Sequence, residues 1–151
     1  MTTAENISLA RRWYQEVWND GRNETIHELL APDAVLIGTD RVEIRGPVEF
    51  ERFAERIRSA FSGNEIIVDD IFGDDDKVAI RWHASMKHTG QMLGIPATGK
   101  VINITGTSIA QFRDGKVVAG WDNWDRLAML EQIGAFTADS TILPPDLAKS
   151  A

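Results

Sequence analysis

Asp122 lies where a carboxylate is costly unless it has a task. Segment 116–124 alternates like a β-strand and follows a second predicted strand, 100–112, across a short turn. The face that carries Asp122 is otherwise made of very small residues: Gly106, Ser108, Ala110 and Gly120. Moving an unpaired carboxylate out of water costs several kcal/mol. A carboxylate kept in such a place is suited to general acid–base chemistry.

The pairing of these two strands depends on the turn between them. Residues 113–115 fit a three-residue loop with glycine in the left-handed conformation, which places Gly106 opposite Asp122. A two-residue Asp-Gly turn instead places Thr107 opposite Asp122 and moves Ser108 to the other face. We favour the three-residue loop.

Small side chains beneath a layer of helices leave a void that must be filled. A ligand would fill it, and so would a bulky helix side chain such as Trp18. The neighbouring strand, 77–88, sends one row of side chains to the same helix-covered face: Val78, Ile80, Trp82, Ala84, Met86 and His88. His88 therefore ends an apolar row, whereas His83 lies on the opposite face.

The elements that position these residues come in a helix-first order. A capping box at Thr2–Glu5 starts a helix whose apolar stripe reaches Trp18, and further helices are predicted over 24–30, 47–61 and 126–133. Strands are predicted at 34–38, 41–45, 65–72, 77–88, 100–112 and 116–124. This order favours an α+β fold, a cone-shaped, curved, mostly antiparallel sheet with three to four helices packed on its concave face. We expect one domain, 1–135, and a C-terminal tail, 136–151.

The composition excludes several classes of protein. There are 16 Lys and Arg against 23 Asp and Glu, a net charge of −7, and no basic run that could bind nucleic acid. Cysteine is absent, which excludes disulfides and thiolate metal sites. No apolar run approaches the roughly 20 residues of a membrane span. The N-terminus lacks the plan of a signal peptide, so we expect a cytoplasmic protein without a membrane partner.

Two other patterns do not carry a cofactor or metal prediction. Residues 94–100 match the spacing of a phosphate-binding loop, but Val101 replaces the magnesium ligand and a strand follows instead of a helix. His83 and His88 lie on opposite faces of one strand and cannot share an ion. The acidic run 74–76 surrounds a predicted turn and lacks the EF-hand pattern. We therefore predict neither a cofactor nor a bound metal.

Five motifs follow one another in the second half of the chain. They are His88-Thr-Gly, Gly94-Ile-Pro-Ala-Thr-Gly, Phe112-Arg-Asp-Gly-Lys, Trp121-Asp-Asn-Trp-Asp and Leu130-Glu-Gln-Ile-Gly. Together they resemble the SnoaL-like polyketide cyclases of the nuclear-transport-factor-2-like superfamily, with a match over about residues 4–135. The resemblance implies that superfamily's α+β barrel, which is usually dimeric through its sheets.

The resemblance also implies a reaction. Characterised family members close a ring of an aromatic polyketide intermediate by intramolecular aldol condensation without a metal or cofactor. Their general acid/base is an Asp at the position that matches Asp122. Anthracycline-pathway members carry a His and a Gln where this sequence has Ser108 and Gly106. We therefore expect a cofactor-independent polyketide or ester cyclase that acts on a small hydrophobic or aromatic polyketide-like substrate.

Each candidate residue has an expected role in this reaction. Asp122 takes and returns the proton, while His88 and Ser108 donate hydrogen bonds to the enolate oxygen. The expected walls of the substrate cavity are Trp18, Trp82, Met86 and Trp124. Trp121 points to the outer sheet face, where a half-apolar surface predicts a homodimer. The alternatives are a non-catalytic protein that binds small hydrophobic ligands, and a dehydratase, isomerase or hydrolase on the same scaffold.

Overall fold

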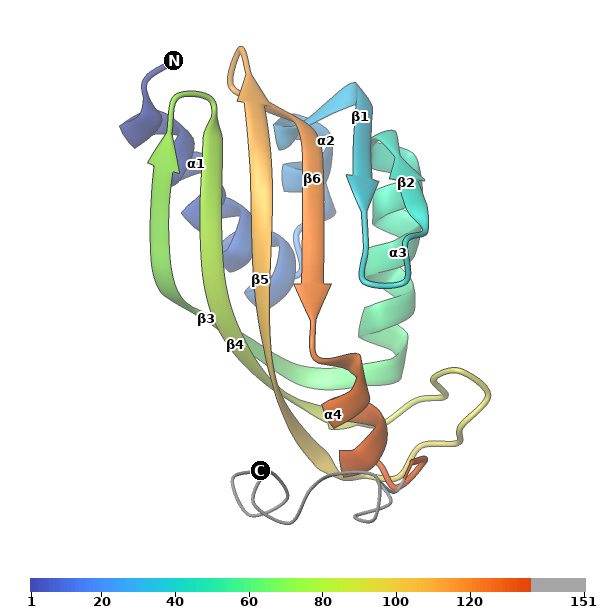
Figure 1. The fold of residues 1–151 in the computed structure, drawn as a ribbon. Helices are drawn as coiled ribbons and strands as arrows, with labels where there is room; N and C mark the ends of the chain where they lie inside the picture. The colour runs from blue at the N-terminus through green and yellow to red at the C-terminus, as the bar shows by residue number, and fades with distance from the viewer. Residues whose placement is uncertain (137–151) are drawn as a thin grey trace.

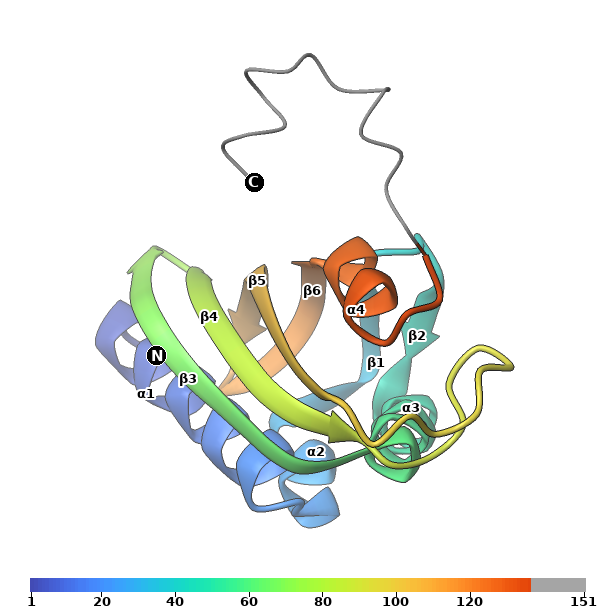
Figure 2. The same ribbon diagram turned by 90° about the horizontal axis from the view of Figure 1, so that it is seen from below.

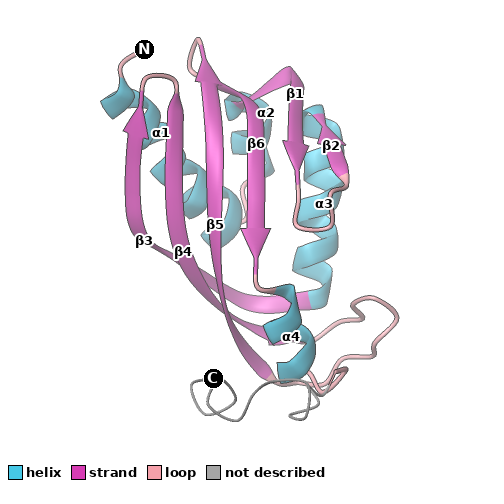
Figure 3. Cartoon of the chain, viewed as in Figure 1, coloured by secondary structure: helices cyan, strands magenta, loops and turns pink. Residues whose placement is uncertain are grey.

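The computed structural model describes residues 1–136, so nearly all of the predicted tail lies outside the described residues. In the described part the helices are α1 (Thr3–Trp13), α2 (Asn23–Leu29), α3 (Gly46–Ala60) and α4 (Arg126–Gln132), and a π-helix, η1 (Tyr14–Asn19), continues α1. The strands are β1 (Leu30–Ile37), β2 (Glu43–Arg45), β3 (Phe61–Asp74), β4 (Lys77–His88), β5 (Val101–Arg113) and β6 (Lys116–Trp124), as Figures 1 and 3 show.

The strands form one mixed sheet in the order β2-β1-β6-β5-β4-β3. Strands β1 and β6 run parallel, and the other neighbours are antiparallel. The sheet is strongly curved and not closed, and α1, α2 and α3 lie on the same side of it (Figure 2). The structure confirms the predicted α+β fold. The large buried side chains between these helices and the sheet make the core.

Local sequence signals account for the helix ends. The predicted capping box is present: the Glu5 N–H donates to Thr2 Oγ1 (3.1 Å), and the Thr2 N–H donates to the Glu5 carboxylate (2.6 Å). Pro47 lies in the first turn of α3, where its missing N–H costs nothing. The first helix was predicted to continue regularly to Trp18, but it widens into η1 at Tyr14. Short π-turns of this kind occur frequently at functional sites.

The turn between β5 and β6 differs from the prediction. Asp114 (φ 51°) and Gly115 (φ 75°) form a two-residue turn with both residues left-handed, as a type I′ hairpin requires. The three-residue loop that we favoured is therefore wrong. An Asp-Gly pair suits this turn because Gly and Asp tolerate positive φ better than other residues.

A bulge beside this turn changes the pairing again. The register shifts between Gln111 and Phe112, which leaves Val118 as an extra residue on β6. Ser108 consequently lies opposite Asp122, and neither predicted partner of Asp122 is correct. The turn and the bulge together displace the favoured register by two residues. Because side chains alternate with a period of two, Ser108 and Asp122 still share the predicted face.

Candidate functional site

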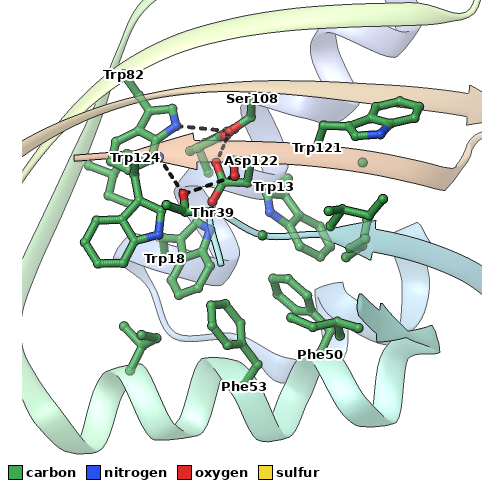
Figure 4. A pocket seen from close by; sticks show the side chains of 18 of the residues that line it. Trp13, Trp18, Thr39, Phe50, Phe53, Trp82, Ser108, Trp121, Asp122 and Trp124 are labelled. Atoms are coloured by element: carbon green, nitrogen blue, oxygen red, sulfur yellow. Dashed lines mark hydrogen bonds between the residues drawn. The ribbon is translucent and has the colours of Figure 1, made fainter. Parts of the chain in front are cut away.

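A cavity of about 520 Å³ lies between the curved sheet and the helices. Its volume is in the range of small-molecule sites. The wall is mainly aromatic and aliphatic, and Figure 4 shows its rings around Asp122. The aromatic residues of this wall include Trp13, Trp18, Phe50, Phe53, Trp82 and Trp124. The ring of Trp18 meets those of Phe50 and Phe53 edge-on, with centroids 5.9 and 6.3 Å apart.

Five exposed residues of the lining mark the mouth of the cavity. They come from the loop after β1, from α3 and from the loop between β4 and β5: Asp40, Val42, Arg56, Gln91 and Leu93. Arg126 at the start of α4 pairs with Asp40 at 3.7 Å. Charged groups thus gather at the mouth, whereas Asp122 lies farther in among the rings.

Ser108 holds the Asp122 carboxylate through one short hydrogen bond. Ser108 Oγ donates to Asp122 Oδ1 at 2.5 Å. The same Oγ accepts from the Tyr14 hydroxyl (2.8 Å) and from Trp82 Nε1 (3.1 Å). An indole N–H can only donate. Burial and the charge of Asp122 raise the pKa of Tyr14, so its hydroxyl stays protonated. With two donors pointing at it, Ser108 directs its one proton to Asp122.

The carboxylate has an unusual affinity for protons. Burial raises the pKa of Asp122 above the ordinary value of an aspartate, and the hydrogen bond from Ser108 opposes this shift without cancelling it. A carboxylate of this kind is a stronger base than one in water, and its conjugate acid persists closer to neutral pH.

Side chains of the protein itself occupy the space beside two glycines on this face. A Cβ on Gly106 would lie 2.2 Å from a ring carbon of Trp82, and one on Gly120 would lie 2.6 Å from a methyl of Leu36. Trp82 and Leu36 are the cross-strand partners of these two glycines. The void expected around them is therefore occupied by neighbouring strands, and not by Trp18. The space left for a ligand is the cavity beyond them.

Thr39 fixes the end of the strand that carries the carboxylate. Strand β1 pairs with β6 as far as Ile37 and Trp121 and then turns away. Thr39 Oγ1 donates to the Asp122 carbonyl (3.2 Å) and accepts from the Trp124 N–H (2.9 Å). A parallel neighbour would satisfy the same two backbone groups with its own backbone. The Thr39 hydroxyl thus extends the ladder by one step.

His88 does not share the cavity with the other predicted residues. It is fully buried, packs against the Phe61 ring and contacts Thr98 through Nδ1 at 3.0 Å. The Thr98 N–H also points at Nδ1 (3.3 Å). His88 is absent from the lining of the cavity, so the expected hydrogen bond from His88 to an enolate oxygen is not supported. Its position anchors the loop between β4 and β5.

The remaining predicted residues come together. Asp122, Ser108, Trp18, Trp82, Met86 and Trp124 all line the cavity. Sequence reasoning missed Tyr14 and Thr39. Tyr14 was assigned to the apolar stripe of the first helix, although a buried tyrosine hydroxyl needs a polar partner, which was a usable signal. Thr39 carried no signal, because its role depends on a loop conformation.

Comparison with known proteins adds to this geometry. A family model described as SnoaL-like polyketide cyclase matches residues 8–133. The chain belongs to the SnoaL-like polyketide cyclase family. This cyclase-family chain is 28% identical to the aklanonic acid methyl ester cyclase DauD from Streptomyces sp. (strain C5) over 135 residues, covering 85% of this chain and 81% of DauD. It is 26% identical to the enzyme of the same description, DnrD, from Streptomyces peucetius, covering 85% of this chain and 90% of DnrD.

Solved structures of the family share the fold. A SnoaL-like protein from Jannaschia sp. CCS1 superposes with a TM-score of 0.83 at 21% identity, covering 89% of this chain and 95% of that one. AclR from Streptomyces galilaeus superposes with a TM-score of 0.82 at 24% identity, covering 99% and 100%. At these identities the likeness concerns the fold alone.

Among residues 1–136, no group of three or more His, Asp and Glu side chains is placed to hold a metal ion. In the same part of the chain, no helix is long and apolar enough to cross a membrane.

The raised pKa of Asp122 predicts how stability depends on pH. The folded state binds this proton more tightly than the unfolded chain does, so stability falls as pH rises from about 3.9, the unfolded value, through the raised pKa. Asp122→Asn removes the titration and keeps an acceptor for Ser108. Its stability relative to the wild type should increase with pH, by about 1.4 kcal/mol for each unit by which the pKa is raised. Urea denaturation between pH 3 and pH 8 measures this difference.

The matched control is Asp114→Asn in the exposed β5–β6 turn, where Asn-Gly suits the same type I′ geometry. Its stability curve should run parallel to that of the wild type. If the stability curve of Asp122→Asn also ran parallel to that of the wild type, burial would not raise the pKa of Asp122.

Thr39→Val should loosen the end of β6. The substitution keeps the volume and removes both hydrogen bonds, leaving the Asp122 carbonyl and the Trp124 N–H without a side-chain partner. We expect a loss of about 1–3 kcal/mol in the free energy of unfolding and faster hydrogen exchange at the Trp124 amide. Thr39→Ser keeps the hydroxyl and should retain the slow exchange. Equal exchange rates in both variants would show that the Thr39 hydroxyl does not stabilise the end of β6.

Proposed function

We propose that this protein catalyses a cofactor-independent, intramolecular aldol ring closure of a small aromatic polyketide-like substrate, with Asp122 as the general base and acid. The observation that carries the proposal is a carboxylate of raised pKa inside an aromatic cavity, tied through one oxygen to Ser108. Membership of the cyclase family and the aklanonic acid methyl ester cyclases among its relatives support the same reaction.

The proposed steps balance without a further reactant. Asp122 takes a proton from a carbon flanked by carbonyl groups, and the electron pair of the broken C–H bond delocalises onto oxygen as an enolate. The enolate carbon attacks a second carbonyl of the same molecule and forms the C–C bond. The new alkoxide takes the proton back from Asp122, which restores the carboxylate.

The hydrogen-bond pattern suits this role. Within residues 1–136, Ser108 is the one side chain that hydrogen-bonds to the Asp122 carboxylate, and it occupies Oδ1. Oδ2 remains as the basic atom for the substrate. The rings of Trp18, Trp82 and Trp124 would fold a flexible substrate so that its reacting carbons meet, which lowers the entropic part of the barrier.

Asp122→Asn should lower turnover by about 10²- to 10⁴-fold, the usual contribution of general acid–base catalysis, while ligand binding persists. Aklanonic acid methyl ester is the first candidate substrate to test, because relatives of the chain are named for it. Chromatography should follow the reaction, since an intramolecular aldol step leaves the mass unchanged. In D₂O the wild type should also exchange the acidic C–H of the substrate faster than buffer alone does, and Asp122→Asn should leave the exchange at the buffer rate.

Asp114→Asn controls for the loss of one negative charge and should turn over normally. Near-native turnover by Asp122→Asn would refute the role of Asp122. A wild-type protein that binds aromatic ligands but neither converts them nor exchanges their protons would be the non-catalytic binding protein instead.

We also propose that the outer face of the sheet pairs two copies of this chain. This face is opposite the helix-covered face and exposes several large apolar side chains: Ile67 (45%), Phe72 (66%), Ile109 (41%) and Trp121 (38%). Ile109 and Trp121 also border the cavity. Ile109 and Trp121 are cross-strand neighbours at its centre. Exposed large apolar side chains on one sheet face favour an interaction site there.

Sedimentation at micromolar concentration should give a dimer for the wild type and a monomer for Ile109→Asp. Val48→Asp on α3, which also replaces an exposed apolar side chain (55%) but lies away from the outer face, should remain dimeric. A monomeric wild type at this concentration would remove the proposal.

A further inference from the structure

Most hydrogen-bond donors near Asp122 already have partners within the protein. Ser108 gives its one proton to Asp122, and the Tyr14 hydroxyl and the Trp82 indole both donate to Ser108. The Thr39 hydroxyl donates to the backbone carbonyl of Asp122. His88 does not line the cavity. None of these groups is free to stabilise the oxygen on which negative charge develops.

Four indole N–H groups of the lining are not used in this way. One belongs to Trp121, whose side chain alternates to the outer face of the sheet, and the other three belong to Trp13, Trp18 and Trp124. Within residues 1–136, the Nε1 atoms of Trp13, Trp18 and Trp124 make no hydrogen bond, in contrast to that of Trp82. These three nitrogens are also not among the buried atoms without a partner, so each reaches accessible space. Trp13, Trp18 and Trp124 are half-buried, and an indole N–H in the wall of a cavity can donate to a group that enters it. Free indole donors in the wall of one cavity therefore point to an acceptor supplied by a ligand.

The positions of these tryptophans favour an acceptor beside Asp122. Trp124 follows Asp122 by two residues on β6 and so shares its face of the sheet. Trp18 is held edge-on by Phe50 and Phe53, and Trp13 packs against Phe50 with centroids 5.0 Å apart. In Figure 4 the indole nitrogens of Trp13, Trp18 and Trp124 lie on the sides of their rings that face Asp122 and Thr39. Ring packing thus orients the indoles of Trp13 and Trp18 before a ligand arrives.

We infer that the unpaired indole N–H groups of Trp13, Trp18 and Trp124 form an oxyanion-binding site next to Asp122. This inference rests on the proposed function, in which Asp122 removes a proton from carbon and the electron pair moves onto a carbonyl oxygen. Oriented N–H dipoles in a water-poor cavity stabilise that oxygen more in the enolate than in the ketone. They carry no net charge, so they do not lower the basicity of Asp122 as a cationic side chain would. The ligand class they select is a neutral aromatic ketone or ester that becomes an enolate during the reaction.

The test measures how strongly the indole N–H groups stabilise a bound anion, and it needs no catalytic turnover. In the Asp122→Asn background, the probe 6-cyano-2-naphthol is bound and its ionisation is followed by absorption as pH is varied. The bound hydroxyl should ionise more readily than in an apolar cavity without donors, because the N–H groups stabilise its anion. Each of the three tryptophans is then replaced by β-(3-benzothienyl)alanine, which keeps the ring shape and substitutes sulfur for the N–H. Loss of one contacting donor should reduce the ionisation constant of the bound probe about tenfold, equivalent to about 1.4 kcal/mol.

The same replacement at Trp121 is the matched control. Trp121 also borders the cavity, but it precedes Asp122 on the same strand, so its side chain alternates to the outer face, and Figure 4 shows its ring apart from the group around Asp122. It should leave the ionisation unchanged. A reduced constant at one or more of the three positions supports the site and identifies the contacting donor. Unchanged ionisation in all three variants, with probe binding intact, would overturn the inference. Because no turnover is needed, this outcome is distinct from failure of the proposed ring closure, which the Asp122→Asn assay decides.

Discussion

The hydrogen bond from Ser108 to Asp122 constrains the rest of the site. A carboxylate surrounded by aromatic rings loses its hydration, and a neutral donor recovers only part of that loss. Here the donor is a hydroxyl whose acceptor capacity is filled by Tyr14 and Trp82, so its proton has one available direction. Asp122 is therefore oriented but not neutralised, because no cation contacts it within the described residues. A raised pKa follows from that combination.

Trp82 links this hydrogen bond to the backbone of the sheet. Its ring lies over Gly106 so closely that even a Cβ there would come within 2.2 Å of it. The Gln expected at this position in anthracycline-pathway relatives would therefore displace Trp82 and remove one donor from Ser108. The residues at positions 106 and 108 act together: Gly106 leaves room for the Trp82 ring, and the Ser108 hydroxyl accepts the hydrogen bond from its N–H.

Sequence reasoning succeeded where the signal was local and failed where two local signals combined. Alternation along 116–124 and 77–88 was enough to place Asp122, Trp82 and Met86 on the cavity side. The predicted Asp114-Gly115 turn was one residue too long, and the bulge at Val118 shifted the register by one more residue. Because the two shifts add up to two residues, Ser108 and Asp122 share a face as predicted, although the predicted pairing was wrong. His88 was placed on the correct face, but Phe61, its cross-strand partner on β3, packs against its ring and lines the cavity, whereas His88 does not. Packing between neighbouring strands is not encoded by the alternation of one strand.

The fold explains why the chemistry of this site depends on its lining more than on its scaffold. Strands β4, β5 and β6 fix Trp82, Ser108, Asp122 and Trp124 through backbone ladders, which tolerate many side chains. The opposing wall comes from the end of the first helix and from α3, where Trp18, Phe50 and Phe53 hold one another by ring contacts. Ring contacts are less directional than ladder hydrogen bonds, so this wall is held less rigidly than the strands that carry the carboxylate. The sheet thus holds the proposed general base, and the helices shape the opposite wall of the cavity. A change of ring on the helices would therefore change which substrates fit without moving Asp122.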